Sequence, residues 1–146
     1  MNNRRSIKIH IMITAAVMVF IFIQSALPDY MSGAESNVIV RLITGLTGLE
    51  AEPVSFAVRK CAHFTEYLVL GLCLMQNAID LNFRIPWPGL VIACLIGAAY
   101  AVSDELHQSL VAGRSCEIRD MIIDAAGVAM GAEIRFWIYS ARRRKT

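Results

Sequence analysis

Four apolar segments dominate this chain, and polar residues gather near one end of each. The segments cover about residues 9–23, 62–79, 89–102 and 121–138. Their lengths are near or slightly below the ~20 residues that a helix needs to cross the hydrocarbon core of a bilayer. Only 18% of the residues are charged, against about 25% in a typical soluble domain. We therefore predict an all-α fold, an integral membrane four-helix bundle formed by a single domain over residues 1–146.

The basic residues predict how this bundle is oriented. Nine Lys and Arg residues lie at the ends that carry the two termini: Arg4, Arg5, Lys8, Arg84, Arg135, Arg142, Arg143, Arg144 and Lys145. Five lie on the other side: Arg41, Arg59, Lys60, Arg114 and Arg119. Cytoplasmic loops of membrane proteins are enriched in these residues. We expect a multi-pass protein of the plasma membrane (the inner membrane of a cell with two), with both termini cytoplasmic and the polar ends facing outward.

The sequence gives less support to two other interpretations, a cleaved signal peptide and a nucleic-acid-binding protein. A basic start followed by an apolar run also resembles a signal peptide cleaved after Ala26. Gln24 and Ser25 make a poor cleavage pattern, so we favour an uncleaved anchor. The net charge of +2 and the lack of a basic stripe argue against nucleic acid as a partner.

The loop over residues 26–59 contains one further apolar stretch. Pro28 should end the first helix, and Ser36 is placed to cap a short helix that runs to about Gly45. The mixed apolar and polar residues of this stretch fit a helix that lies in the membrane interface. It either covers the outer face of the bundle, which we favour, or acts as a lid over a site.

The second apolar segment begins with a group of ionisable residues. Lys60, His63, Glu66 and Tyr67 are spaced to share roughly one helical face. A His-x-x-Glu pair can bind a metal or act as a hydrogen-bonded base and its orienting group. It can equally be a buried polar network that only holds helices together.

Polar residues also end the third segment and begin the fourth. Asp104, Glu105, His107 and Gln108 lie within five positions, and the following Gly113 would allow a turn that directs Arg114 back toward them. Arg114 is suited to binding a phosphate or carboxylate, or to neutralising Glu66 or Asp120. Which of Asp104 and Glu105 faces inward is left open by the sequence.

In the fourth segment, Asp120 and Asp124 are four residues apart and share a helical face. Asp120 is a candidate N-cap, whereas Asp124 lies a turn deeper and needs a partner such as Lys60, Arg59, Arg114 or a histidine. Gly127 and Gly131 have the small-xxx-small spacing that allows close helix packing. Four cysteines are present, of which Cys61 and Cys116 lie near the same face, and the sequence does not decide whether they pair.

Taken together, these motifs resemble the VanZ-like family. The resemblance rests on residues 58–67, Gly71, residues 104–108, Gly113-Arg114, the Asp120-x-x-x-Asp124-x-x-Gly127-x-x-x-Gly131 ending and Gln24-Ser25. It covers most of the chain. The family consists of small bacterial membrane proteins associated with resistance to glycopeptide antibiotics such as teicoplanin. The resemblance implies that the polar residues act as one unit, and it names no reaction.

Two functional hypotheses follow. An ionisable group at membrane depth is by default a functional-site candidate, so the first is a membrane enzyme that acts on a lipid-linked or anionic molecule of the cell envelope. Its bases or metal ligands would be His63, Glu66, Glu105 and His107, its binding groups Lys60, Gln24, Gln108 and Arg114, and its supporting groups Tyr67, Asp104, Asp120 and Asp124. The identity of any metal or cofactor stays open. The alternative is a non-catalytic envelope protein that binds an antibiotic, a lipid or a partner protein; proton-coupled transport is weaker, since no inverted repeat is visible.

Overall fold

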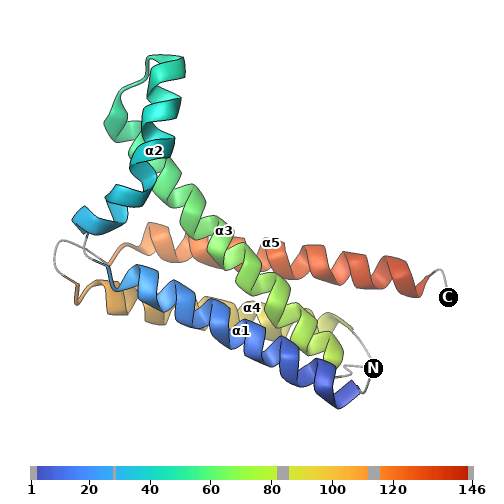
Figure 1. Ribbon diagram of the computed structural model, residues 1–146. Helices are drawn as coiled ribbons and strands as arrows, with labels where there is room; N and C mark the ends of the chain where they lie inside the picture. The colour runs from blue at the N-terminus through green and yellow to red at the C-terminus, as the bar shows by residue number, and fades with distance from the viewer. Residues whose placement is uncertain (1–2, 28, 82–85, 112–115, 145–146) are drawn as a thin grey trace.

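The computed structural model describes residues 3–27, 29–81, 86–111 and 116–144, and throughout these residues the ordered elements are five α-helices without strands. They are α1 (Asn3–Ser25), α2 (Asp29–Thr47), α3 (Ala51–Asp80), α4 (Pro86–Gln108) and α5 (Ile118–Arg143). In Figure 1, α3 crosses the bundle and packs on α1, α4 and α5, and α5 also packs on α4. The start of α1 and the end of α5 lie at the same end of this bundle.

The four predicted segments lie within α1, α3, α4 and α5, so the all-helical prediction is confirmed. Two of these helices are long and apolar enough to cross a membrane, over Arg4–Ser25 and Trp87–Gln108. α3 and α5 are also long, but their polar residues interrupt the apolar stretch that a membrane-spanning helix needs. The four-span topology therefore remains a prediction.

The region of residues 29–60 differs most from the sequence-based expectation. α2 begins at Asp29 rather than near Ser36, and α3 begins at Ala51, eleven residues before the predicted segment. Gly48 adopts a φ of 70°, and its amide donates to the Thr44 carbonyl oxygen at 2.9 Å. A glycine in the left-handed region is a common helix end, and here it reverses the chain between two long helices.

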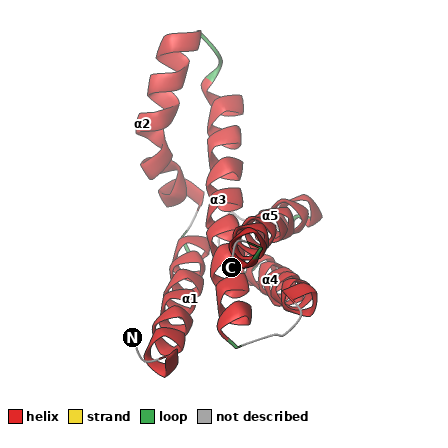
Figure 2. Cartoon of the chain, turned by 90° about the vertical axis from the view of Figure 1, so that its right-hand side faces the viewer, coloured by secondary structure: helices red, strands yellow, loops and turns green. Residues whose placement is uncertain are grey.

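As a result, α2 and the first part of α3 form a helical hairpin that projects from the bundle (Figure 2). α2 packs mainly on α3. The predicted role of this helix as a cover across the outer face of the bundle is therefore wrong for this structure. The apolar side chains that α2 turns inward, such as Val40, are buried by α3, whereas Val38, Leu42 and Leu46 are exposed.

The closest packing in the bundle is between α3 and α5, and glycines make it. A Cβ placed on Gly131 would lie 2.0 Å from the backbone oxygen of Leu68, and one on Gly127 would lie 2.6 Å from that of Phe64. From α3, a Cβ on Gly71 would lie 2.1 Å from the backbone oxygen of Val128. The predicted close-packing role of Gly127 and Gly131 is confirmed, and Gly71 complements it from the opposing helix.

The core lies around this contact, and the outer surface is apolar. Tyr67, Leu70 and Val128 are fully buried at the centre. α4 is tied to α1 by the Tyr100 hydroxyl, which donates to the Met18 carbonyl oxygen at 2.6 Å. α1 exposes many large apolar side chains along its length, including Met12, Val19 and Ile23. Exposed apolar surface of this extent is typical of a face that contacts a membrane or a partner.

The glycine contact generates a stability prediction. Gly131→Ala should destabilise the protein by about 1–3 kcal/mol, the usual cost of overpacking a tight core, because the new methyl group meets backbone that cannot move alone. Gly45→Ala in α2 is the control: a Cβ there has no neighbour within 4 Å, and alanine is the better helix former. Thermal unfolding in detergent should show a lower midpoint for Gly131→Ala alone. Equal midpoints would contradict the packing described here.

Candidate functional site

The polar residues meet where α1 and α4 end, α5 begins and the middle of α3 passes. Asp104 is the centre of this group and is only 2% exposed. Its carboxylate accepts hydrogen bonds from Ser25 Oγ of α1 at 2.6 Å, Tyr67 Oη of α3 at 3.1 Å and Gln108 Nε2 of α4 at 3.1 Å. We call the following set the Asp104 cluster: Ser25, Lys60, Tyr67, Asp104, Glu105, Gln108, Asp120 and Asp124.

The structure answers which of the two adjacent acids faces inward, because both do. Glu105 is 1% exposed and points toward the start of α5, where the backbone amide of Glu117 donates to its Oε2 at 3.3 Å. Free amides at a helix start attract negative charge. Asp104 thus joins α4 to α1 and α3, whereas Glu105 joins α4 to α5.

Asp120 forms an ion pair with Lys60, and this pair links α5 to α3. Both side chains are mostly buried. The interpretation of Asp120 as an N-cap is wrong, since Glu117 is the N-cap residue of α5 and Asp120 lies three positions further along. The Lys60 ammonium also lies 5.1 Å from the centre of the Phe56 ring, a cation–π contact that holds its stem in place.

Asp124 is the least satisfied member of the Asp104 cluster. It is 1% exposed, and among the described residues its Oδ1 has no hydrogen-bond partner. It interacts electrostatically with Asp104, Glu105 and Asp120, and with Lys60. Lys60 was among its predicted partners, but the direct ion pair of Lys60 is with Asp120. A buried polar atom without a partner is uncommon in native structures and needs an explanation.

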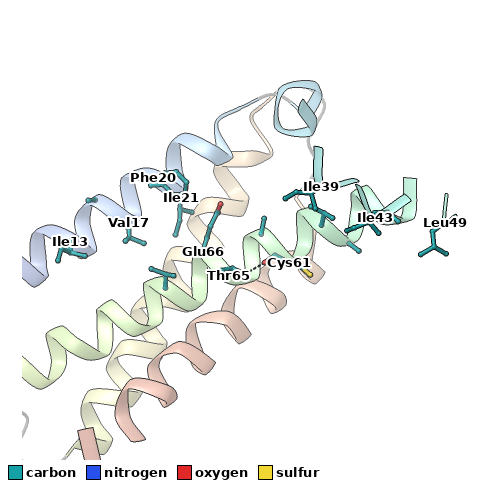
Figure 3. A pocket seen from close by; sticks show the side chains of 16 residues that line it. Ile13, Val17, Phe20, Ile21, Ile39, Ile43, Leu49, Cys61, Thr65 and Glu66 are labelled. Carbon is teal, nitrogen blue, oxygen red and sulfur yellow. Dashed lines mark hydrogen bonds between the residues drawn. The ribbon is translucent and has the colours of Figure 1, made fainter. Parts of the chain in front are cut away.

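The α3 motif does not act through one face as its spacing suggested. Lys60 and Tyr67 contact α5 and α4, respectively, within the Asp104 cluster. Glu66 instead lines an apolar groove bounded by α1, α2 and α3 (Figure 3). His63 is half-buried on the same helix. One step along a helix turns a side chain by about 100°, so neighbouring Glu66 and Tyr67 face different sides.

The remaining predicted residues lie around the edge of the cluster or outside the described residues. The ring of His107 stacks on Phe22 of α1, with centroids 4.3 Å apart, and its buried Nδ1 has no hydrogen-bond partner within the described structure. Gln24 is half-buried one position before Ser25. Gly113 and Arg114 lie outside the described residues.

Metal binding and disulfide formation can be compared with the geometry only for the residues described. Within those ranges, no group of three or more His, Cys, Asp or Glu side chains is arranged to hold a metal ion. All four cysteines are unpaired thiols, with Cys61 and Cys116 both exposed. The question that the sequence left open about Cys61 and Cys116 is therefore answered: the structure contains no such bridge.

A second polar network lies at the opposite end of the bundle, and sequence reasoning missed it. One carboxylate oxygen of Asp80 of α3 is hydrogen-bonded to Nδ1 of His10 of α1 at 2.5 Å, and the other accepts from Gln76 Nε2 at 2.8 Å. Gln76 Oε1 accepts from Arg135 Nε of α5 at 2.6 Å. The sequence does show isolated polar residues within or beside the apolar segments. It gives no means of predicting that such residues from three different helices pair with one another.

The hydrogen-bond pattern predicts opposite effects for two buried aspartates. Asp104→Leu should destabilise the protein by roughly 3 kcal/mol or more, because several buried donors lose their acceptor at about 1–3 kcal/mol each. Asp124→Leu, a change of the same size in the same cluster, should be neutral or stabilising, because it removes an incompletely paired buried carboxylate. Thermal unfolding of the two variants in one detergent tests this. Equal losses would mean that Asp124 is also a structural tie.

Comparison with known proteins gives one match. The model of the VanZ/LLP1 family matches residues 10–141. No curated protein and no solved structure matches the chain. The match covers most of the chain and every residue of the Asp104 cluster, and the chain belongs to the VanZ/LLP1 family.

Proposed function

We propose that this chain is a multi-pass protein of the plasma membrane that uses the Asp104 cluster to act on a molecule of the cell envelope. The membrane location is supported by the two span-length apolar helices, the exposed apolar face of α1 and the family. The two termini would be cytoplasmic, since Arg4, Arg5 and Lys8 lie in the first turns of α1 and Arg142 and Arg143 end α5, at the same end of the bundle. The Asp104 cluster would then face outward.

One observation carries the catalytic proposal: Asp124 is fully buried and its Oδ1 lacks a hydrogen-bond partner within the described residues. Folding energetics alone do not favour such a group. Stability is commonly given up at sites that need reactive groups. Asp124 and Glu105 would exchange a proton with a bound substrate, which is the work of a general acid–base pair. His63, Glu66 and His107 remain candidates for the same role.

The substrate would be a lipid-linked or anionic envelope molecule, with its head group held by the polar side chains. Lys60, Gln24, Gln108 and Arg114 are the candidate binding groups. A phosphate would have to compete with Asp120 for Lys60, because these two are already paired. Tyr67, Asp104 and Asp120 would support the site by fixing α3, α4 and α5. Modification of such a molecule would alter the surface that a glycopeptide antibiotic meets, which links this proposal to the resistance association.

A non-catalytic role is the second candidate, and the saturated bonding of Asp104 favours it. A carboxylate that accepts from three helices is typical of a network that fixes one packing arrangement. The protein would then bind an antibiotic, a lipid or a partner protein without changing it. The two candidates differ in whether any envelope molecule is covalently altered.

Asp124→Asn tests the catalytic proposal, since it keeps the size of the side chain and removes its acid–base chemistry. Cells that express the wild type should differ from cells that express Asp124→Asn in teicoplanin susceptibility and in the mass of an extracted envelope molecule. Glu133→Gln, at an exposed position on the same helix, is the control and should match the wild type. Variant abundance in the membrane must be equal.

Each other result has a definite meaning. If Asp124→Asn matches the wild type in teicoplanin susceptibility and in the mass of the envelope molecule, the catalytic proposal is wrong. Altered susceptibility with no change in any envelope molecule would favour the binding role. Loss of the variant from the membrane would assign Asp124 to structure.

A further inference from the structure

An apolar groove lies outside the Asp104 cluster. It is bounded by α1, α2 and α3, with α3 as its floor, and has a volume of about 1100 Å³ (Figure 3). Its lining is apolar except for Thr65 and Glu66, together with the thiol of Cys61. It runs along α3 from Val54 to Val69, which is about 22 Å at 1.5 Å per residue.

The walls and the length of the groove indicate what surrounds it. One wall is α1, a span-length helix whose apolar side chains are mostly exposed. In a membrane, the part of the groove beside α1 would open to hydrocarbon rather than to water. Its length exceeds the ~15 Å of one leaflet, half of a ~30 Å hydrocarbon core. The chain of a membrane lipid therefore fits along it.

The volume of the groove suits a small ligand with a flexible chain. It lies close to the range of about 300–1,000 Å³ that is usual for sites of small ligands.

The groove and the Asp104 cluster are joined through two helices. Ile21 lines the groove, and Ser25, one turn further along α1, donates to Asp104. On α3, Glu66 lines the groove, and the next residue, Tyr67, donates to Asp104. An amphiphile with its chain in the groove would thus have its polar head near the cluster.

We propose that the groove binds the hydrocarbon chain of one membrane amphiphile and thereby presents the head group of that molecule to the Asp104 cluster. This inference rests on the proposed function and names its substrate class: a lipid with a long chain rather than a water-soluble molecule. Glu66, at the boundary, is placed to contact the first polar atoms above the chain.

The test uses a palmitoyl lysophospholipid with a photoreactive diazirine on its chain, at low proportion in phosphatidylcholine vesicles that contain the full-length protein. After illumination, labelled peptides are mapped by mass spectrometry. The groove residues of α1 and α3 should be labelled several-fold more than the exposed face of α4 around Leu95. Ala16→Trp, which fills the groove, should reduce this labelling several-fold. Ala99→Trp, at an exposed position on α4, is the control and should not.

Labelling that only follows exposure, or that Ala16→Trp leaves unchanged, would overturn the inference. Crosslinking of one copy to another through the groove would overturn it too. The same probe on Asp124→Asn separates this inference from the proposed function, because groove labelling should persist in that variant. If the groove is labelled but no envelope molecule is chemically changed, the groove binds a lipid chain and the catalytic proposal is wrong. If an envelope molecule is chemically changed but the groove is not labelled, the catalytic proposal holds and the inference about the groove is wrong.

Discussion

The close approach of α3 and α5 is the contact on which the rest of this structure depends. Gly71, Gly127 and Gly131 let the two backbones touch, because no side chain separates them. In a bilayer, where apolar surface is not driven together by water, such backbone contact is a main source of helix association. It also fixes how deep Asp124 lies, one turn from Gly127, and so sets the position of the Asp104 cluster.

The Asp104 cluster combines two kinds of buried carboxylate. Asp104 is held by donors from α1, α3 and α4, and this bonding fixes the angle between those helices. Asp124 of α5, which interacts electrostatically with Asp104, has an oxygen without a hydrogen-bond partner among the described residues. In the proposed site, Asp104 would hold the neighbouring helices in position, since reactive groups must be held in place by others.

Polar networks at both ends of the bundle join the helices to one another. At one end the Asp104 cluster ties all of α1, α3, α4 and α5, and at the other the network of His10, Asp80, Gln76 and Arg135 joins α1, α3 and α5. The apolar middle of α1 makes few buried contacts, which leaves one side of it open to the groove. The opening between α1 and α3 is thus a consequence of where the polar ties lie.

The sequence by itself determined the helices, the close packing at Gly127 and Gly131, and the residues at the polar end of the bundle. These follow from local rules: apolar length, helical period and the size of glycine. Tertiary structure decided the early start of α3, the inward direction of both Asp104 and Glu105, and the separation of Glu66 from Tyr67. It also paired Asp80 with His10. The reason is physical: a side chain finds its partner only when helices far apart in the chain cross at a given angle and depth, and no spacing within one helix encodes that crossing.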